Sequence, residues 1–276
     1  MKLFRSRRRG DDETMAETPM AEAKALYQKG RYAESEAEAR AVARSRPRDD
    51  GYAAGALLIA ALATGAQGRN AEALVTYDDA LARFSAIFGA DHYLTWKLRS
   101  DRAQHLPSLG EYAECEAECA AVTAFAAGGT GPDMTRLAAA ARNGLIFALN
   151  AQERHQEAEA LAREALAACP AGEPMSLVLR LGLARSLNGQ ARYEEALAEA
   201  RRADRQDRAL PERERNSERG AVELALANAL LGLGRVREAN GLAVAAHDAC
   251  LASFGPDHRR TVEARTLLDR MDGARP

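Results

Sequence analysis

The chain has 276 residues, enough for about two ordinary domains or for one elongated array. Its 38 Lys and Arg residues are balanced by 40 Asp and Glu residues, a net charge of −2, so it lacks the basic excess of a dedicated nucleic-acid-binding protein. Its 62 alanines against three isoleucines and eight valines, with 5% aromatic residues, exclude a sheet-rich fold, because strands favour β-branched and aromatic side chains.

The first sixteen residues differ in composition from the rest. Residues 1–16 are predicted to be a disordered tail, basic and then acidic, and residues 17–276 a single repeat domain. No apolar segment follows the basic start and no uncharged apolar stretch reaches 18 residues, so neither a secretory signal nor membrane insertion is predicted, and the expected location is the cytoplasm. The arginine-rich start is interpreted as a solvated tail, with contact to an anionic membrane or nucleic acid as the alternative.

One short motif recurs six times along the chain. A small residue is followed by Arg or Glu, an aromatic residue, any residue, Glu and usually Ala. The steps between copies are 38, 42, 43, 38 and 43 residues, which is the regular spacing of a repeat architecture. The copies begin at Gly30, Gly68, Gly110, Glu153, Ala191 and Gly234.

The motif predicts a tight turn between two helices. Glycine lets the chain leave the first helix through a left-handed conformation, and the aromatic residue is expected to wedge between the paired helices. Glu falls in the first turn of the second helix, where the helix dipole favours it, and Ala is expected where two helices cross closely. Because one pair cannot bury its apolar face alone, the pairs are expected to stack into a solenoid.

A second motif, Phe-Gly-x-Asp-His-x-x-Thr, occurs at residues 88–95 and 254–261, with a degenerate copy at residues 131–135. Gly and Pro are expected to end one helix, and Asp91 or Asp257 to cap the next. His92 and His258 are therefore interpreted as linker residues rather than ligands or bases, since no further ligands accompany them.

Together these motifs resemble the tetratricopeptide repeat (TPR) family, in particular the long repeats of kinesin light chains and related bacterial proteins. The resemblance covers about residues 17–272 and implies an all-α, right-handed superhelical solenoid of about six helix–turn–helix repeats. A final unpaired helix within residues 261–271 is expected to cap it. Glu153 in place of Gly and Asn70 in the aromatic position depart from the pattern.

Motifs of catalytic chemistry are absent from the sequence. It contains no phosphate-binding loop, no dinucleotide fingerprint, no H-E-x-x-H and no nucleophile elbow. Among the four cysteines there is no C-x-x-C pair, so Cys115 and Cys119 are interpreted as core residues. We therefore expect a protein that is not an enzyme and needs no cofactor or metal.

The resemblance implies that the first helix of each pair lines the concave face, which predicts a peptide-binding groove. Asn side chains there can donate to and accept from a peptide backbone, and Lys97 and Arg185 can bind a carboxylate. Asn143 matches an Asn of kinesin-light-chain-like repeats. The predicted groove residues are Lys97, Ser100, Gln104, Asn143, Asn150, Arg185, Asn188 and Asn228.

Three functions remain open from the sequence. The first is a non-catalytic scaffold or interaction module that binds a partner peptide or helix in the groove, in bacterial signalling or regulation. The second is a cytoplasmic sensor of a small peptide or metabolite. The third is an enzyme whose site carries no recognisable motif. No nucleic-acid partner is expected, and the sequence does not indicate an oligomeric state.

Overall fold

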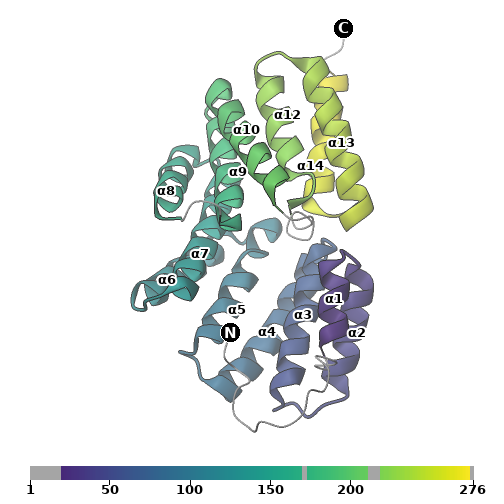
Figure 1. The fold of residues 1–276 in the computed structure, drawn as a ribbon, viewed down its shortest axis with the longest axis vertical. Helices are drawn as coiled ribbons and strands as arrows, with labels where there is room; N and C mark the ends of the chain where they lie inside the picture. The colour runs from purple at the N-terminus through teal and green to yellow at the C-terminus, as the bar shows by residue number, and fades with distance from the viewer. Residues whose placement is uncertain (1–19, 170–172, 211–217, 274–276) are drawn as a thin grey trace.

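Thirteen α-helices and one short 3-10 turn make up most of the computed structural model, which describes residues 20–169, 173–210 and 218–273 (Figure 1). No strand occurs within these ranges, so the all-α prediction is confirmed. The helices follow one another as pairs: α1 (Ala21–Gln28) and α2 (Tyr32–Arg44), α3 (Gly51–Ala66) and α4 (Asn70–Phe88), α5 (Tyr93–Ala103) and α6 (Tyr112–Ala127), α7 (Pro132–Ala151) and α8 (His155–Ala168), α9 (Pro174–Gly189) and α10 (Tyr193–Ala209), α12 (Ala221–Gly232) and α13 (Val236–Phe254), and then α14 (Arg259–Asp272).

Each of the six sequence motifs forms the turn inside a helix pair. The first motif residue has a left-handed backbone, with φ between 58° and 81° in all six copies. Four of them are Gly, which adopts this conformation readily, whereas Glu153 and Ala191 adopt it against their preference. The second helix then begins at the third motif position, at Tyr32, Asn70, Tyr112, His155, Tyr193 and Val236.

The small residue that ends each motif lies at a close helix crossing, as predicted. This position is fully buried in every repeat, and a larger side chain would displace a neighbouring helix. In the first repeat it is Ser35, whose hydroxyl donates a hydrogen bond of 2.7 Å to the Ala23 carbonyl of α1. The six residues are Ser35, Ala73, Cys115, Ala158, Ala196 and Ala239.

The aromatic residue of the motif also packs against the next repeat, which the sequence did not predict. A Cβ atom placed on Gly232 of α12 would lie 2.2 Å from the Tyr193 ring, and one on Gly189 of α9 would lie 2.3 Å from His155. Glycine in the following helix therefore makes room for the wedge. The wedge thus joins consecutive repeats as well as filling its own turn.

The Gly-x-Asp-His linkers place His, not Asp, at the helix N-cap. The Nδ1 atom of His92 accepts a hydrogen bond of 3.2 Å from the backbone N–H of Leu94, and His258 accepts one of the same length from Arg260. The Asp residues precede the cap, so the prediction that they cap these helices is wrong. The recurring Thr of the motif has its own function: the hydroxyl of Thr261 donates back to the Gly255 carbonyl at 2.8 Å.

Charged clamps cross several interfaces between repeats. In each clamp a Glu in the second helix of one repeat binds a Gln and an Arg that flank the next turn. Because the Gln and the Arg flank a short turn, their bonds to the Glu fix the rotation of one repeat relative to the next. The clamps within the described residues are Glu36 with Gln67 and Arg69, Glu116 with Gln152 and Arg154, and Glu159 with Gln190 and Arg192.

The two ends of the solenoid meet. The rings of Tyr32 at the start of α2 and Phe254 at the end of α13 stack with centroids 5.9 Å apart. Cys250 and Ala63 belong to the same buried cluster. A Cβ atom on Gly68 would lie 2.8 Å from the Cα of His258. Figure 1 shows one end of α13 and α14 close to one end of α1–α3, so the array curves until its last repeat touches its first.

The predicted tail, residues 1–16, lies outside the described residues, as do residues 170–172 before α9 and 211–217 before α12. Within the described residues, no helix is both long and apolar enough to cross a membrane. Cys115 and Cys119 are both buried in the core, as expected, and their sulfur atoms lie 3.9 Å apart.

Candidate functional site

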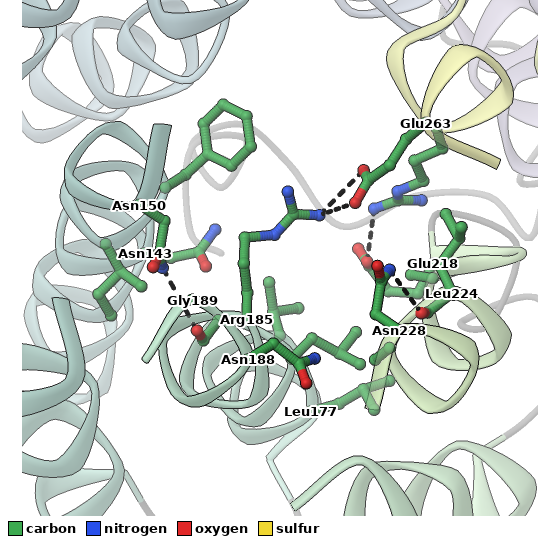
Figure 2. Close-up of a pocket in the computed structure, with 18 of the residues that line it drawn as sticks. Asn143, Asn150, Leu177, Arg185, Asn188, Gly189, Glu218, Leu224, Asn228 and Glu263 are labelled. Carbon is green, nitrogen blue, oxygen red and sulfur yellow. Dashed lines mark hydrogen bonds and ion pairs between the residues drawn. The ribbon is translucent and has the colours of Figure 1, made fainter. Parts of the chain in front are cut away.

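A central cavity of about 930 Å³ lies inside the curved array. Its walls come mainly from the first helices of the later repeats, α7, α9 and α12, and from α14. Figure 2 shows side chains from these helices pointing towards a common space, with Asn143 and Asn150 on one wall and Asn228 opposite. The cavity therefore lies on the face that the sequence predicted for a groove.

The structure brings six of the eight predicted groove residues to this cavity: Gln104, Asn143, Asn150, Arg185, Asn188 and Asn228. Lys97 and Ser100 do not line it. The ammonium group of Lys97 pairs with Asp101 at 2.5 Å on its own helix, and Ser100 is 1% exposed with a hydroxyl that has no hydrogen-bond partner among the described residues. The third repeat thus contributes less to the cavity than the sequence predicted.

Two of the four Asn side chains are occupied by the fold. The amide of Asn150 donates to the Ser186 hydroxyl at 3.0 Å, and its oxygen contacts Nδ1 of His155 at 3.0 Å. Asn228 donates to the Leu224 carbonyl of its own helix at 2.9 Å. Asn150 thus holds α7 against α8 and α9, whereas the amide of Asn228 is bonded within its own helix.

The other two Asn side chains retain unused hydrogen-bonding groups. The side-chain oxygen of Asn188 is buried and has no partner within the described part of the chain. Asn143 lines the cavity, and no hydrogen bond joins its side chain to another described residue. A buried acceptor without a partner is unfavourable, and a rotation of the Asn188 amide towards the cavity would let a ligand donate a hydrogen bond to it.

A charged cluster spans the cavity between α9 and α14. Arg185 extends from α9 and donates two hydrogen bonds to the Glu263 carboxylate, at 2.7 and 2.9 Å (Figure 2). Arg259 approaches the same carboxylate at 3.8 Å and covers the ring of Phe147, with 4.2 Å from its guanidinium carbon to the ring centroid. The cluster therefore joins the last helix to two earlier repeats.

The pKa values of this cluster reflect its burial and its excess of positive charge. Burial and then the charge of Arg185 lower the pKa of Arg259 to about 10. Burial alone would raise the pKa of Glu263, but the guanidinium groups of Arg185 and Arg259 outweigh it and hold that pKa below its ordinary value. Both residues are thus charged at neutral pH, and the two arginines share one carboxylate.

A second ion pair lies at the edge of the same cavity. Arg260 donates to Glu218 at 2.6 Å, and both side chains are largely buried. The sequence predictions missed Arg259, Arg260 and Glu263, because these residues were interpreted only as part of a linker and a cap, and they also missed Glu218, which precedes α12. One signal was present: α14 begins with two Arg residues, at the helix end where cations are disfavoured.

No group of three or more His, Cys, Asp or Glu side chains suited to a metal ion occurs among the described residues. His155 lies against Gly189 in the wedge position and His258 caps α14, so both have structural surroundings. The cavity offers hydrogen-bonding amides and charged groups, which are suited to binding.

Comparisons with known proteins agree with this architecture. Two structures of putative kinesin light chain TPR-like repeats from Podosopora anserina, one of them carrying a single substitution, align over 68% of this chain and 92% of theirs. Each shows 18% sequence identity, with TM-scores of 0.52 and 0.53. No sequence-family description and no curated protein matches the chain. The resemblance expected from the repeated motifs is confirmed at the level of structure: the chain has the fold of the TPR-like repeat proteins.

Proposed function

We propose that this chain is a non-catalytic interaction module that holds a short segment of a partner protein in its central cavity. The observation that carries the proposal is the cavity of about 930 Å³ whose walls present Asn143 and Asn188 with unused hydrogen-bonding groups. An extended peptide brings unpaired N–H and C=O groups. An Asn amide can bind both kinds of group, because its oxygen accepts and its NH₂ group donates hydrogen bonds. Repeat solenoids typically use such concave surfaces for binding other proteins.

The volume of the cavity limits the size of the segment. At about 930 Å³, with walls from α7, α9, α12 and α14, the cavity is comparable in size to the binding site of a small ligand. A few residues of extended chain fit this space better than a long helix. This narrows the sequence-based proposal, which allowed either a peptide or a helix.

A small molecule is the second candidate, and the cavity volume supports it. Binding sites for small ligands typically measure roughly 300–1,000 Å³, and this cavity falls within that range. Such a ligand would raise the melting temperature of the purified protein by mass action. A metabolite library tested by thermal shift therefore distinguishes this candidate from peptide binding.

Selection of phage-displayed random peptides against the immobilised protein tests the peptide proposal. Selected peptides should bind wild type tightly and the Asn143→Ala/Asn188→Ala double variant about tenfold more weakly, the effect of losing about two neutral hydrogen bonds. Asn240→Ala is the matched control, because Asn240 is on α13 and is not among the cavity residues. Equal affinity for all three proteins would refute binding in the cavity.

A further inference from the structure

We infer that Arg259, Arg185 and Phe147 form a carboxylate-binding subsite at the α14 end of the cavity. The inference rests on the proposed function, since it names the group by which a bound peptide is anchored. It concerns α14, which in an ordinary solenoid acts only as a cap.

The charge balance of the cluster is the first argument. Two guanidinium groups face one carboxylate: Arg185 takes both oxygens of Glu263 at 2.7 and 2.9 Å, while Arg259 remains 3.8 Å away. Beyond this long contact, Arg259 has no ion-pair partner among the described residues. Its side chain is 36% exposed, so a ligand in the cavity can reach it. A second carboxylate would complete the pairing of the two arginines.

The geometry of Phe147 is the second argument. The ring lies under both guanidinium groups, with centroid distances of 4.2 Å to Arg259 and 5.8 Å to Arg185. Stacking on an aromatic ring restricts the planar guanidinium, so less side-chain entropy is lost when an anion binds. The hydrogen-bonding edges are then presented in a fixed direction, as a bidentate carboxylate site requires.

The start of α14 is the third argument. The helix begins at Arg259 and its first turn contains no acidic residue, although the positive end of the helix dipole favours anions and disfavours cations. Arg260 is compensated by Glu218 at 2.6 Å, but Arg259 has no comparably close anion among the residues the structure describes. A cation at a helix N-terminus without a close anion is unfavourable in the free chain, and such a locally unfavourable residue is typical of a functional position. An anion bound at Arg259 would supply the missing compensation.

The ligand class follows from these groups. One unit of positive charge is left over when Arg185, Arg259 and Glu263 are counted together, which matches a singly charged carboxylate. The planar fork of Arg fits such a group in two parallel hydrogen bonds. Arg185 already binds one carboxylate, because its Nη2 atom donates to both oxygens of Glu263. In a peptide this group is either an Asp or Glu side chain or the C-terminal carboxylate.

Three acetylated tetrapeptides separate these two sources. Acetyl-Ala-Ala-Ala-Glu amide carries only a side-chain carboxylate, acetyl-Ala-Ala-Ala-Gln acid carries only a terminal one, and acetyl-Ala-Ala-Ala-Gln amide carries none. Binding to the full chain is measured by titration calorimetry at two ionic strengths. At least one carboxylate peptide should bind more tightly than the neutral peptide, with affinity that falls as salt rises.

Substitutions then locate the site. Arg259→Gln should weaken the carboxylate peptide about tenfold, the effect of losing one charge-assisted contact. Glu263→Gln should strengthen it several-fold, because the competing internal carboxylate is removed. Arg235→Gln is the control: Arg235 is paired with Glu238 at a hairpin turn outside the cavity and should bind as wild type. Far-UV dichroism of each variant confirms that it is folded.

The outcomes separate the subsite from the proposed function. Equal binding of all three peptides, no binding by any of them, an unchanged affinity in Arg259→Gln or a weaker one in Glu263→Gln would overturn the carboxylate subsite. If selected neutral peptides still depend on Asn143 and Asn188, peptide binding stands and only the subsite fails. If carboxylate peptides bind through Arg259 but the two Asn substitutions have no effect on any selected peptide, the subsite stands and the assignment of Asn143 and Asn188 to peptide binding fails.

Discussion

The carboxylate of Glu159 in α8 accepts a hydrogen bond of 2.6 Å from Arg192, which belongs to the turn of the following repeat. Gln190 donates to the same oxygen at 2.7 Å, and the Glu159 side chain is 13% exposed. Burial alone would raise the pKa of Glu159, but the hydrogen bonds from Gln190, Arg163 and Arg192 outweigh it and lower that pKa. This contact fixes the orientation of one repeat relative to the next.

Glu159→Gln is therefore expected to destabilise the protein by about 1–2 kcal/mol, because a largely buried charge-assisted contact is lost. Urea denaturation followed by far-UV dichroism measures the change. The matched control is Glu157→Gln: Glu157 pairs with Arg154 at 2.8 Å, but its side chain is 60% exposed, so the expected change is within about 0.5 kcal/mol. Equal effects of the two substitutions would contradict the clamp.

Placing glycine in the two turns that lack it is expected to stabilise the protein. Glu153 and Ala191 have φ of 61° and 58°, a conformation that costs a side-chain-bearing residue roughly 1 kcal/mol relative to Gly. Ala191→Gly and Glu153→Gly are each expected to raise the melting temperature, measured by calorimetry. Gly234→Ala, with φ of 74° at the equivalent position, is the reverse control and should lower it. A fall in melting temperature for both gain variants would show that these turns are not strained.

Glycines inside helices should differ sharply in their tolerance of a methyl group. A Cβ atom at Gly232 meets the Tyr193 ring at 2.2 Å, whereas one at Gly241 of α13 meets nothing within 4 Å. Gly232→Ala is expected to destabilise by about 1–3 kcal/mol through overpacking. Gly241→Ala should stabilise by about 0.5–1 kcal/mol through its higher helix propensity. Chemical denaturation of both variants checks the sign, and the same sign for both would contradict the wedge packing.

Two buried histidines, His105 and His258, should make the folded protein less stable at mildly acidic pH. Burial lowers the pKa of His105 to about 4, and burial together with Arg260 and Arg259 lowers that of His258 to about 3. The unfolded chain, with His pKa values near 6.5, therefore binds more protons than the folded chain below that pH. Stability should be nearly constant above pH 6.5 and fall as the pH is lowered towards 4.

His258→Asn isolates one of these groups, since Asn is also a good N-cap residue. The variant should show a shallower decrease in melting temperature between pH 6.5 and 5, a range in which ordinary carboxylates remain ionised. Scanning calorimetry at a series of pH values gives the slope. A slope identical to that of wild type would mean that His258 titrates normally in the folded protein.

The repeat unit was predictable because it is determined locally. A left-handed residue followed by a wedge and a small residue fixes the turn, and the six second helices begin at the six wedge positions. The N-cap was not assigned correctly, because Asp91 and His92 are adjacent and both residue types can accept from the helix backbone. Only the backbone path shows that His92 is the residue at the N-cap.

The site was predictable only where it depends on repeat register. Asn143, Asn188 and Asn228 line the cavity because they occupy the inner face of first helices. The charged cluster depends instead on the total curvature of the array, which brings Glu263 of α14 against Arg185, 78 residues earlier. That curvature is the sum of small rotations at every repeat interface, and no single motif encodes it.

The stacking of Tyr32 on Phe254 has a consequence for how this protein can change over evolutionary time. Open solenoids tolerate the duplication or deletion of a unit, because each unit contacts only its neighbours. Here one additional or missing pair of helices would move Phe254 away from Tyr32 and Glu263 away from Arg185. These contacts therefore require this particular number of units, as closure does in a β-propeller.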